Sequence, residues 1–166
     1  MSILLLGARR DVGEAVVTRL VGRGDEVRVV EPDASAADRW RALGAYVAIG
    51  SPDDADLVER AAQNVRTAVV FGDVDRGPIL QGIGAAGVGR VVLCLDRYDA
   101  HAAEGEVELV ALLVPRTRFP RRPTVSPEAI AEAVDAADDL AGNPRMVVDL
   151  GDAQAWRALG LESPET

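Results

Sequence analysis

The sequence predicts an α/β fold: a doubly wound, mostly parallel sheet of six to seven strands with helices on both faces. Three observations predict it. Short, continuously apolar runs recur along the chain, segments of helical periodicity separate most of them, and a glycine turn follows the first run. Runs that are apolar throughout are typical of strands buried on both faces. Strands that alternate with helices indicate a parallel sheet. We expect the Rossmann-like strand order 3-2-1-4-5-6, with room for a seventh strand.

Seven apolar runs are the predicted strands: Ile3–Leu6, Val27–Glu31, Tyr46–Ile49, Ala68–Phe71, Val91–Leu95, Leu109–Val114 and Met146–Leu150. Helices are expected to start at Ser35 and at Ser126, because a hydroxyl can cap a first turn. Gly44 and Gly87 are expected to follow helix ends. Asp152 is expected to cap a last short helix.

Composition narrows the classes of protein. The 166 residues suggest one domain, and with 48% hydrophobic but only 4% aromatic residues its core is built from aliphatic side chains. A net charge of −9 argues against nucleic acid as the main partner. No apolar run approaches the roughly 20 residues that span a bilayer, so no membrane partner is expected.

The chain contains one cysteine, Cys94, and therefore no internal disulfide framework. Met1 leads directly into a strand-like run without a basic leader, and we expect a cytoplasmic protein. All 18 basic residues are arginine. Arginine in place of lysine, together with abundant alanine, suggests a GC-rich bacterial genome. Any mechanism that needs a lysine of this chain is excluded.

The segment "GARRDVG", residues 7 to 13, follows the first strand-like run. In a strand–turn–helix unit, the amides at the helix start attract a phosphate group. Glycines in such a turn allow the tight bend, the approach of a pyrophosphate and the packing of helix on strand. Gly7 fits the first of these roles and Gly13 the last. Glu31 closes the second strand, where an acidic residue would accept a hydrogen bond from a ribose 2′-hydroxyl.

Three segments carry a family resemblance: "GARRDVGEAVVTRLVGRGDEVRVV", "GAYVAIGSPDDADLVERAAQNVRTAVVF" and "AAGVGRVVLCL". In their order and spacing they resemble the short-chain dehydrogenase/reductase superfamily, most closely its atypical, NmrA-like branch of NAD(P)-binding Rossmann domains. The resemblance covers nearly the whole chain. It implies a single NAD(P)-binding domain over residues 1–166.

The resemblance implies a set of cofactor-binding residues: Gly7, Arg9, Arg10, Asp11, Val12, Gly13, Glu31, Gly50, Ser51, Phe71 and Gly72. The glycine motif is degenerate. The atypical branch has GxxGxxG and would place its middle glycine at Arg10; the better known branch has GxxxGxG and would place it at Asp11. A side chain at either position crowds a pyrophosphate. Asp11 would also repel it, whereas Arg9 and Arg10 would offset that charge.

The expected cofactor is NAD or NADP, with NAD favoured. The arginine that matches Arg10 in "GASRGIG" proteins often lies where a 2′-phosphate would bind. Glu31 opposes a 2′-phosphate at the same place. Weak binding, and a scaffold that has lost all dinucleotide binding, both stay open.

The family's catalytic equipment is missing. Its reductases use a tyrosine, a lysine four residues later that lowers the tyrosine pKa, and a serine after the fifth strand. Four residues after Tyr98 stands Ala102, and the serine position falls at Leu95 or Asp96. Only about a dozen residues join the fifth and sixth strands, where the family has a long helix. We assign no catalytic residue and do not expect ordinary carbonyl reduction.

Other candidate residues favour structural roles. His101 lies on a polar stretch that is typical of a solvated surface. Cys94 lies inside an apolar strand and is expected to be a small buried hydrophobe. Asp53, Asp54 and Asp56 lack the spacing of a calcium loop and indicate a helix start, so no metal is expected.

Four arginines lie in the segment "PRTRFPRRP" after the sixth strand: Arg116, Arg118, Arg121 and Arg122. They are candidates for binding the phosphate or carboxylate of an anionic small molecule, since guanidinium groups match both. The favoured alternative is a solvated loop that pairs with acids of its own or of a partner chain.

Three hypotheses remain. The first is an NAD(P)- or nucleotide-binding module without standard reductase activity, with a regulatory role. The second is a small atypical oxidoreductase or isomerase. The third is a Rossmann scaffold that binds no dinucleotide and acts through protein contacts. A homodimer is an open hypothesis for the assembly.

Overall fold

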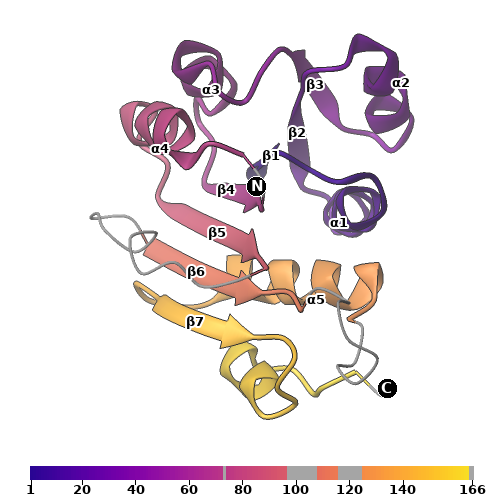
Figure 1. The fold of residues 1–166 in the computed structure, drawn as a ribbon, viewed down its shortest axis with the longest axis vertical. Coiled ribbons are helices and arrows are strands. Elements are labelled where there is room, and N and C mark those ends of the chain that lie inside the picture. The colour runs from indigo at the N-terminus through magenta and orange to yellow at the C-terminus, as the bar shows by residue number, and fades with distance from the viewer. Residues whose placement is uncertain (73, 97–107, 116–124, 165–166) are drawn as a thin grey trace.

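The computed structural model describes residues 1–72, 74–96, 108–115 and 125–164. In this part of the chain seven parallel strands form one sheet of order β3-β2-β1-β4-β5-β6-β7, which confirms the predicted order and the seventh strand (Figure 1). The strands are β1 (Ser2–Leu6), β2 (Glu26–Glu31), β3 (Tyr46–Ile49), β4 (Thr67–Phe71), β5 (Arg90–Leu95), β6 (Glu108–Leu113) and β7 (Arg145–Asp149).

Helices cover both faces of the sheet (Figure 1). They are α1 (Arg10–Gly22), α2 (Ala34–Ala42), α3 (Ala55–Ala61), α4 (Arg76–Ala85), α5 (Pro127–Asp139) and the 3₁₀ helix η2 (Ala155–Leu159). α1, α2, α5 and η2 contribute to the core on one face, and α3 and α4 to the core on the other. The fold is doubly wound, as expected.

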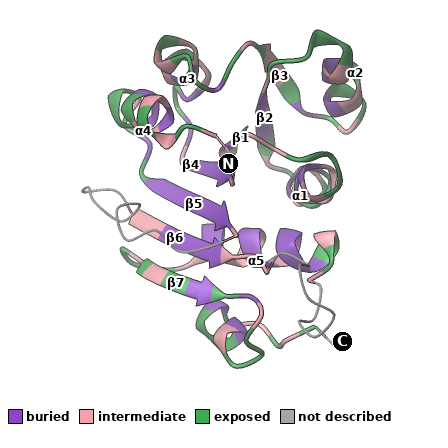
Figure 2. Cartoon of the chain, viewed as in Figure 1, coloured by how far each residue is buried: buried purple, intermediate pink, exposed green. Residues whose placement is uncertain are grey.

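The central strands are buried on both faces (Figure 2). In β1, Ile3 and Leu5 pack toward α1 and α5, whereas Leu4 and Leu6 pack toward α3 and α4. Both faces of such a strand need apolar side chains, because successive residues point to opposite sides. This explains why the strand sequences are continuously apolar rather than alternating.

Two predicted helix caps are wrong. The N-cap of α2 is Asp33, whose carboxylate accepts from the backbone N–H of Ser35, so Ser35 lies inside the first turn. Asp152 accepts from the N–H of Gln154, which is itself the residue before η2. The Ser126 cap of α5 is confirmed by the hydrogen bond its hydroxyl accepts from the N–H of Ala129.

An ion-pair network ties α5 to the amino ends of the strands. Arg23, just after α1, donates to Asp25 at 2.5 Å, to Asp138 at 2.6 Å and to Asp135. Asp138 is 1% exposed and also accepts from the hydroxyl of Thr67 at 2.5 Å. Burial lowers the pKa of Arg23, but its hydrogen bonds to Asp138 and Asp25 outweigh this and leave the pKa raised. The network lies at the end of the sheet opposite to the glycine turn.

Among the described helices, none is long and apolar enough to cross a membrane.

Candidate functional site

The turn after β1 lies at the carboxyl edge of the sheet, where the strand order changes direction. β1 pairs with β2 on one side and with β4 on the other. Open α/β sheets bind ligands in the crevice outside the strand ends at this point. Gly7 follows β1 and α1 begins at Arg10, so residues 10–13 of the motif already form the first helical turn.

Gly7 has a left-handed backbone with φ of +68°. A Cβ at this position would lie 2.7 Å from Cγ1 of Val74 and 3.0 Å from the carbonyl oxygen of Phe71. The turn therefore packs closely against the segment that follows β4. Phe71 is 4% exposed, and the N–H of Gly72 donates to the carbonyl of Cys94 at 2.9 Å. The structure thus brings the predicted site residues Gly7 and Phe71 together.

The N-terminus of α1 lacks a side-chain cap. Its N-cap residue, Arg9, makes no capping hydrogen bond with its side chain. The first intrahelical bond runs from the N–H of Gly13 to the carbonyl of Arg9, at 2.6 Å. The N–H groups of residues 10–12 precede this bond and have no intrahelical acceptor. The other four α-helices of the described ranges start at capping side chains, namely Asp33, Asp54, Asp75 and Ser126.

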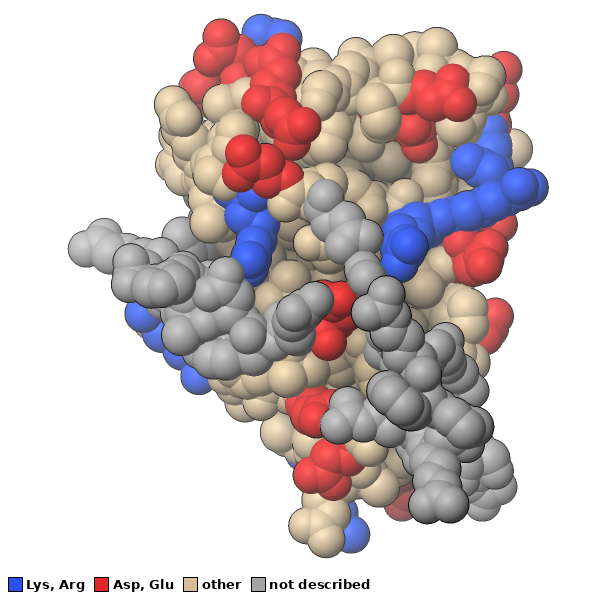
Figure 3. Space-filling model, viewed as in Figure 1, with Lys and Arg blue, Asp and Glu red and all other residues tan. Residues whose placement is uncertain are grey.

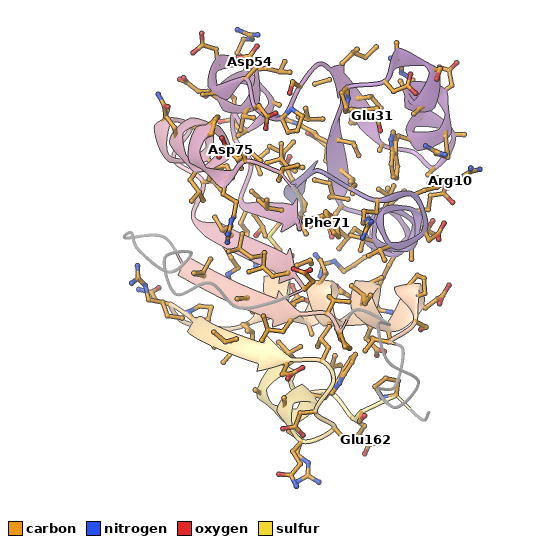
Figure 4. The ribbon with its side chains drawn as sticks, in the orientation of Figure 1. Arg10, Glu31, Asp54, Phe71, Asp75 and Glu162 are labelled. Carbon is orange, nitrogen blue, oxygen red and sulfur yellow. The ribbon has the colours of Figure 1, made fainter. Side chains whose placement is uncertain are left out.

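Arg10 and Asp11, which replace the middle glycine, lie on the outer surface of α1. The Arg10 side chain is 74% exposed, its Nε is 3.7 Å from Oε1 of Glu14, and it points away from the sheet (Figure 4). Asp11 lines a groove of about 630 Å³ between α1 and α5. The other lining residues of this groove are Glu14, Ala15, Thr18, Arg19, Leu43, Pro127, Glu128 and Ala131.

The Glu31 carboxylate at the end of β2 is held at both oxygens. Oε2 accepts from the indole N–H of Trp40 at 2.8 Å, and Oε1 accepts from the backbone N–H of Asp33 at 2.9 Å. Trp40 is 1% exposed, and its ring lies against Gly13: a Cβ there would be 2.8 Å from Cη2 of the indole. The packing role expected of Gly13 is real, but the close partners are Trp40 of α2 and Ala8 rather than a strand.

Gly50 and Ser51 follow β3 at the same edge. The N–H of Gly50 donates to the carbonyl of Glu31 at 3.0 Å, which joins the ends of β2 and β3. The Ser51 hydroxyl accepts from the N–H of Asp53 at 3.1 Å. Gly50 therefore lies beside Glu31, whereas the Ser51 hydroxyl is engaged in the turn before α3.

Basic side chains gather beside the start of α1. Figure 3 shows them along the right side of the molecule, while acidic side chains gather over α3. Nε of Arg39 lies 3.2 Å from Oε1 of Glu14, and its guanidinium lies 5.4 Å from the centre of the Trp40 ring. Arg39, Trp40 and Val74 were missed by the sequence analysis. The one signal available was that tryptophan is rare in this chain, with two in total.

Some of the remaining candidate residues lie within the described ranges and others lie outside them. Cys94 is buried, and desolvation raises the pKa of its thiol to about 12, which confirms the expected buried hydrophobe. Asp54 caps α3 and Asp56 lies in its first turn, so these acids start a helix as predicted. No group of three or more potential metal ligands is found within the described ranges. Tyr98, His101 and the arginines 116, 118, 121 and 122 lie outside the described residues.

No family model and no curated protein matches the sequence. Solved structures do match. The anaerobillin reductase ChuY of Escherichia coli O157:H7 is 15% identical, with a TM-score of 0.70 over 90% of this chain and 96% of that chain. The UDP-glucose 4-epimerase of Bifidobacterium longum, in complex with NAD+ and UDP, is 12% identical, with a TM-score of 0.71 over 100% and 85%.

A third match is the triphenylmethane reductase of Citrobacter sp., complexed with NADP(H). It is 10% identical, with a TM-score of 0.66 over 89% of this chain and 69% of that chain. At these identities the likeness concerns the fold. The chain has the Rossmann-like α/β fold that these reductases and this epimerase share, as its resemblance to the short-chain dehydrogenase/reductase superfamily implied.

Proposed function

We propose that this chain is an NAD(P)-binding Rossmann module of the short-chain dehydrogenase/reductase type that lacks the Tyr–Lys reduction step. The observation that carries the proposal is the uncapped start of α1, directly behind Gly7 at the point where the strand order reverses. Free N–H groups at a helix start favour a phosphate. Two structures with the same fold, one in complex with NAD+ and the other with NADP(H), support the same class of ligand.

The residues present fit such a cofactor. The N–H groups of residues 10–12 would face a pyrophosphate, and the Glu31 carboxylate would accept from an adenosine ribose hydroxyl. Phe71, Gly72 and Val74 would line the next part of the crevice, where β4 ends. A bound nicotinamide would supply hydride chemistry. Since the chain has no lysine, a Tyr–Lys pair of its own cannot supply the proton.

NAD(H) is expected to bind more tightly than NADP(H), because Glu31 would repel a 2′-phosphate. Two like charges about 4 Å apart repel by about 1 kcal/mol in water, which corresponds to several-fold in affinity. Glu31→Ala is expected to narrow the difference between the two cofactors. Tighter NADP(H) binding by the parent protein would mean that the arginines beside α1 outweigh Glu31.

Isothermal calorimetry with NAD, NADH, NADP and NADPH tests the proposal. We expect the parent to bind weakly and glycine in the motif to strengthen binding. Arg10→Gly tests the alignment with the atypical branch, which places the middle glycine at the first residue of α1. The matched variant Arg10→Ala removes the same charge but keeps a Cβ. It therefore separates charge from crowding, and Asp11→Gly tests the other alignment.

A scaffold that acts through protein contacts is the second candidate. The observation that favours it is the groove between α1 and α5, which presents Asp11 and Glu128 on a surface away from the crevice. Absence of calorimetric binding by the parent, Arg10→Gly and Asp11→Gly alike would favour this candidate over the first.

A further inference from the structure

Trp40 contacts two parts of the proposed cofactor site: Glu31 at the end of β2, and Gly13 in the helix that follows β1. Its indole N–H donates to Oε2 of Glu31 at 2.8 Å, while the N–H of Asp33 binds the other carboxylate oxygen. Hydrogen bonds to an ionised carboxylate are about twice as strong as neutral ones. The two bonds therefore fix the plane of the Glu31 carboxylate at the end of β2.

The same indole ring sets the distance between α2 and α1. It packs on Gly13 in the first turn of α1, where any Cβ would meet Cη2 at 2.8 Å. The Arg39 guanidinium lies 5.4 Å from the centre of the ring, and its Nε lies 3.2 Å from Glu14. The buried side chain of Trp40 thus contacts both Glu31, which would accept a hydrogen bond from a ribose, and Gly13, in the helical turn that would face the pyrophosphate.

We propose that Trp40 is a positioning residue that sets the discrimination between a ribose 2′-hydroxyl and a 2′-phosphate; this inference rests on the proposed dinucleotide binding. Held by the indole, the Glu31 carboxylate stays at the ribose position and repels a phosphate. Without the indole N–H, only the N–H of Asp33 holds the carboxylate, and Oε2 can turn toward the arginines beside α1. The 2′ position then loses part of its negative charge, and NADP(H) gains affinity relative to NAD(H).

Trp40→Phe tests the inference, because it keeps an aromatic ring on α2 and removes the indole N–H together with the outer part of the ring; the control below carries the same loss of ring. The dissociation constants of NADH and NADPH are measured by calorimetry for the parent and the variant. We expect the ratio of the NADPH constant to the NADH constant to fall about three- to tenfold, less than the full value of a charge-assisted hydrogen bond, because the N–H of Asp33 still holds the carboxylate. In a Glu31→Gln background, Trp40→Phe should leave the ratio unchanged.

Trp156→Phe is the matched control. Trp156 is also 1% exposed, and its indole N–H donates to the carbonyl of Leu150 at 3.1 Å, on the β7 side of the sheet. This variant removes the same group from an equally buried tryptophan outside the site. We expect it to leave the NADPH-to-NADH ratio as in the parent, whatever it does to stability.

A second measurement needs no ligand and no change at Trp40. The chain has two indole N–H resonances, and Glu31→Gln should shift that of Trp40 while that of Trp156 stays in place. An unmoved Trp40 resonance would overturn the contact. Equal weakening of NADH and NADPH by Trp40→Phe would show a merely structural tryptophan. Failure of the parent, Arg10→Gly and Asp11→Gly alike to bind either cofactor would instead refute the proposed function, even if the Trp40 resonance responds.

Discussion

Gly7→Ala tests the geometry of the turn that the proposed site depends on. A non-glycine residue in the left-handed region costs roughly 1–2 kcal/mol, and Gly7 lies there at φ +68°. The new Cβ would also be 2.7 Å from Val74 Cγ1 and 3.0 Å from the Phe71 carbonyl oxygen. Such overpacking typically costs about 1–3 kcal/mol. Together these contributions predict a loss of about 2–5 kcal/mol in the free energy of unfolding.

Urea unfolding followed by circular dichroism measures this loss. The matched control is Gly87→Ala, because Gly87 has φ of +71° but no atom within 4 Å of the position of a Cβ. It should lose only the backbone contribution of roughly 1–2 kcal/mol. In a Val74→Ala background, Gly7→Ala should cost less than in the parent, because one of its two close contacts is removed. Equal losses for Gly7→Ala and Gly87→Ala in the parent would refute the close packing of the turn.

Three further predictions concern stability. Asp138→Ala should lower the free energy of unfolding by about 3–5 kcal/mol in urea titrations, because it removes the buried carboxylate that accepts from both Arg23 and Thr67; a loss below 1 kcal/mol would contradict this. Burial raises the pKa of Asp25, but hydrogen bonds from the amino terminus and Arg23 hold it below its usual value. Its contribution is therefore present above the unfolded pKa of about 4 and lost as pH falls through the lower folded value. In Asp25→Asn, the free energy of unfolding should therefore fall less steeply than in the parent as the pH is lowered below about 4. An equally steep fall in both proteins would count against the prediction. Gly82→Ala should destabilise by about 1–3 kcal/mol in thermal unfolding, because its Cβ would lie 2.6 Å from a carbonyl oxygen of α3, whereas Gly84→Ala, with no atom within 4 Å, should stabilise by about 0.5–1 kcal/mol. A change in stability in the same direction for Gly82→Ala and Gly84→Ala would contradict the close approach of α3 and α4.

The strands could be predicted from the sequence because their signals are local, and their order was expected because strands that alternate with helices around a glycine turn are typical of a Rossmann-like sheet. A run such as Ile3–Leu6 is apolar at every residue, and only a strand covered on both faces needs that pattern. The positions of Gly44 and Gly87 after helix ends were predicted for a similar reason. Glycine adopts the left-handed backbone conformation that often ends a helix without the steric cost of a Cβ. The start of α2 was placed two residues too late, because two residues able to cap a helix, Asp33 and Ser35, lie close together in the sequence.

The sequence by itself therefore determined the fold class, the strand order and the place of the glycine turn. Only the tertiary structure decided what surrounds that turn: Val74 against Gly7, Trp40 between Gly13 and Glu31, and Asp11 in the groove toward α5. These contacts join segments that are distant in sequence. They depend on how each helix sits on the sheet, and periodicity along one segment carries no information about the side chain that a second segment brings against it.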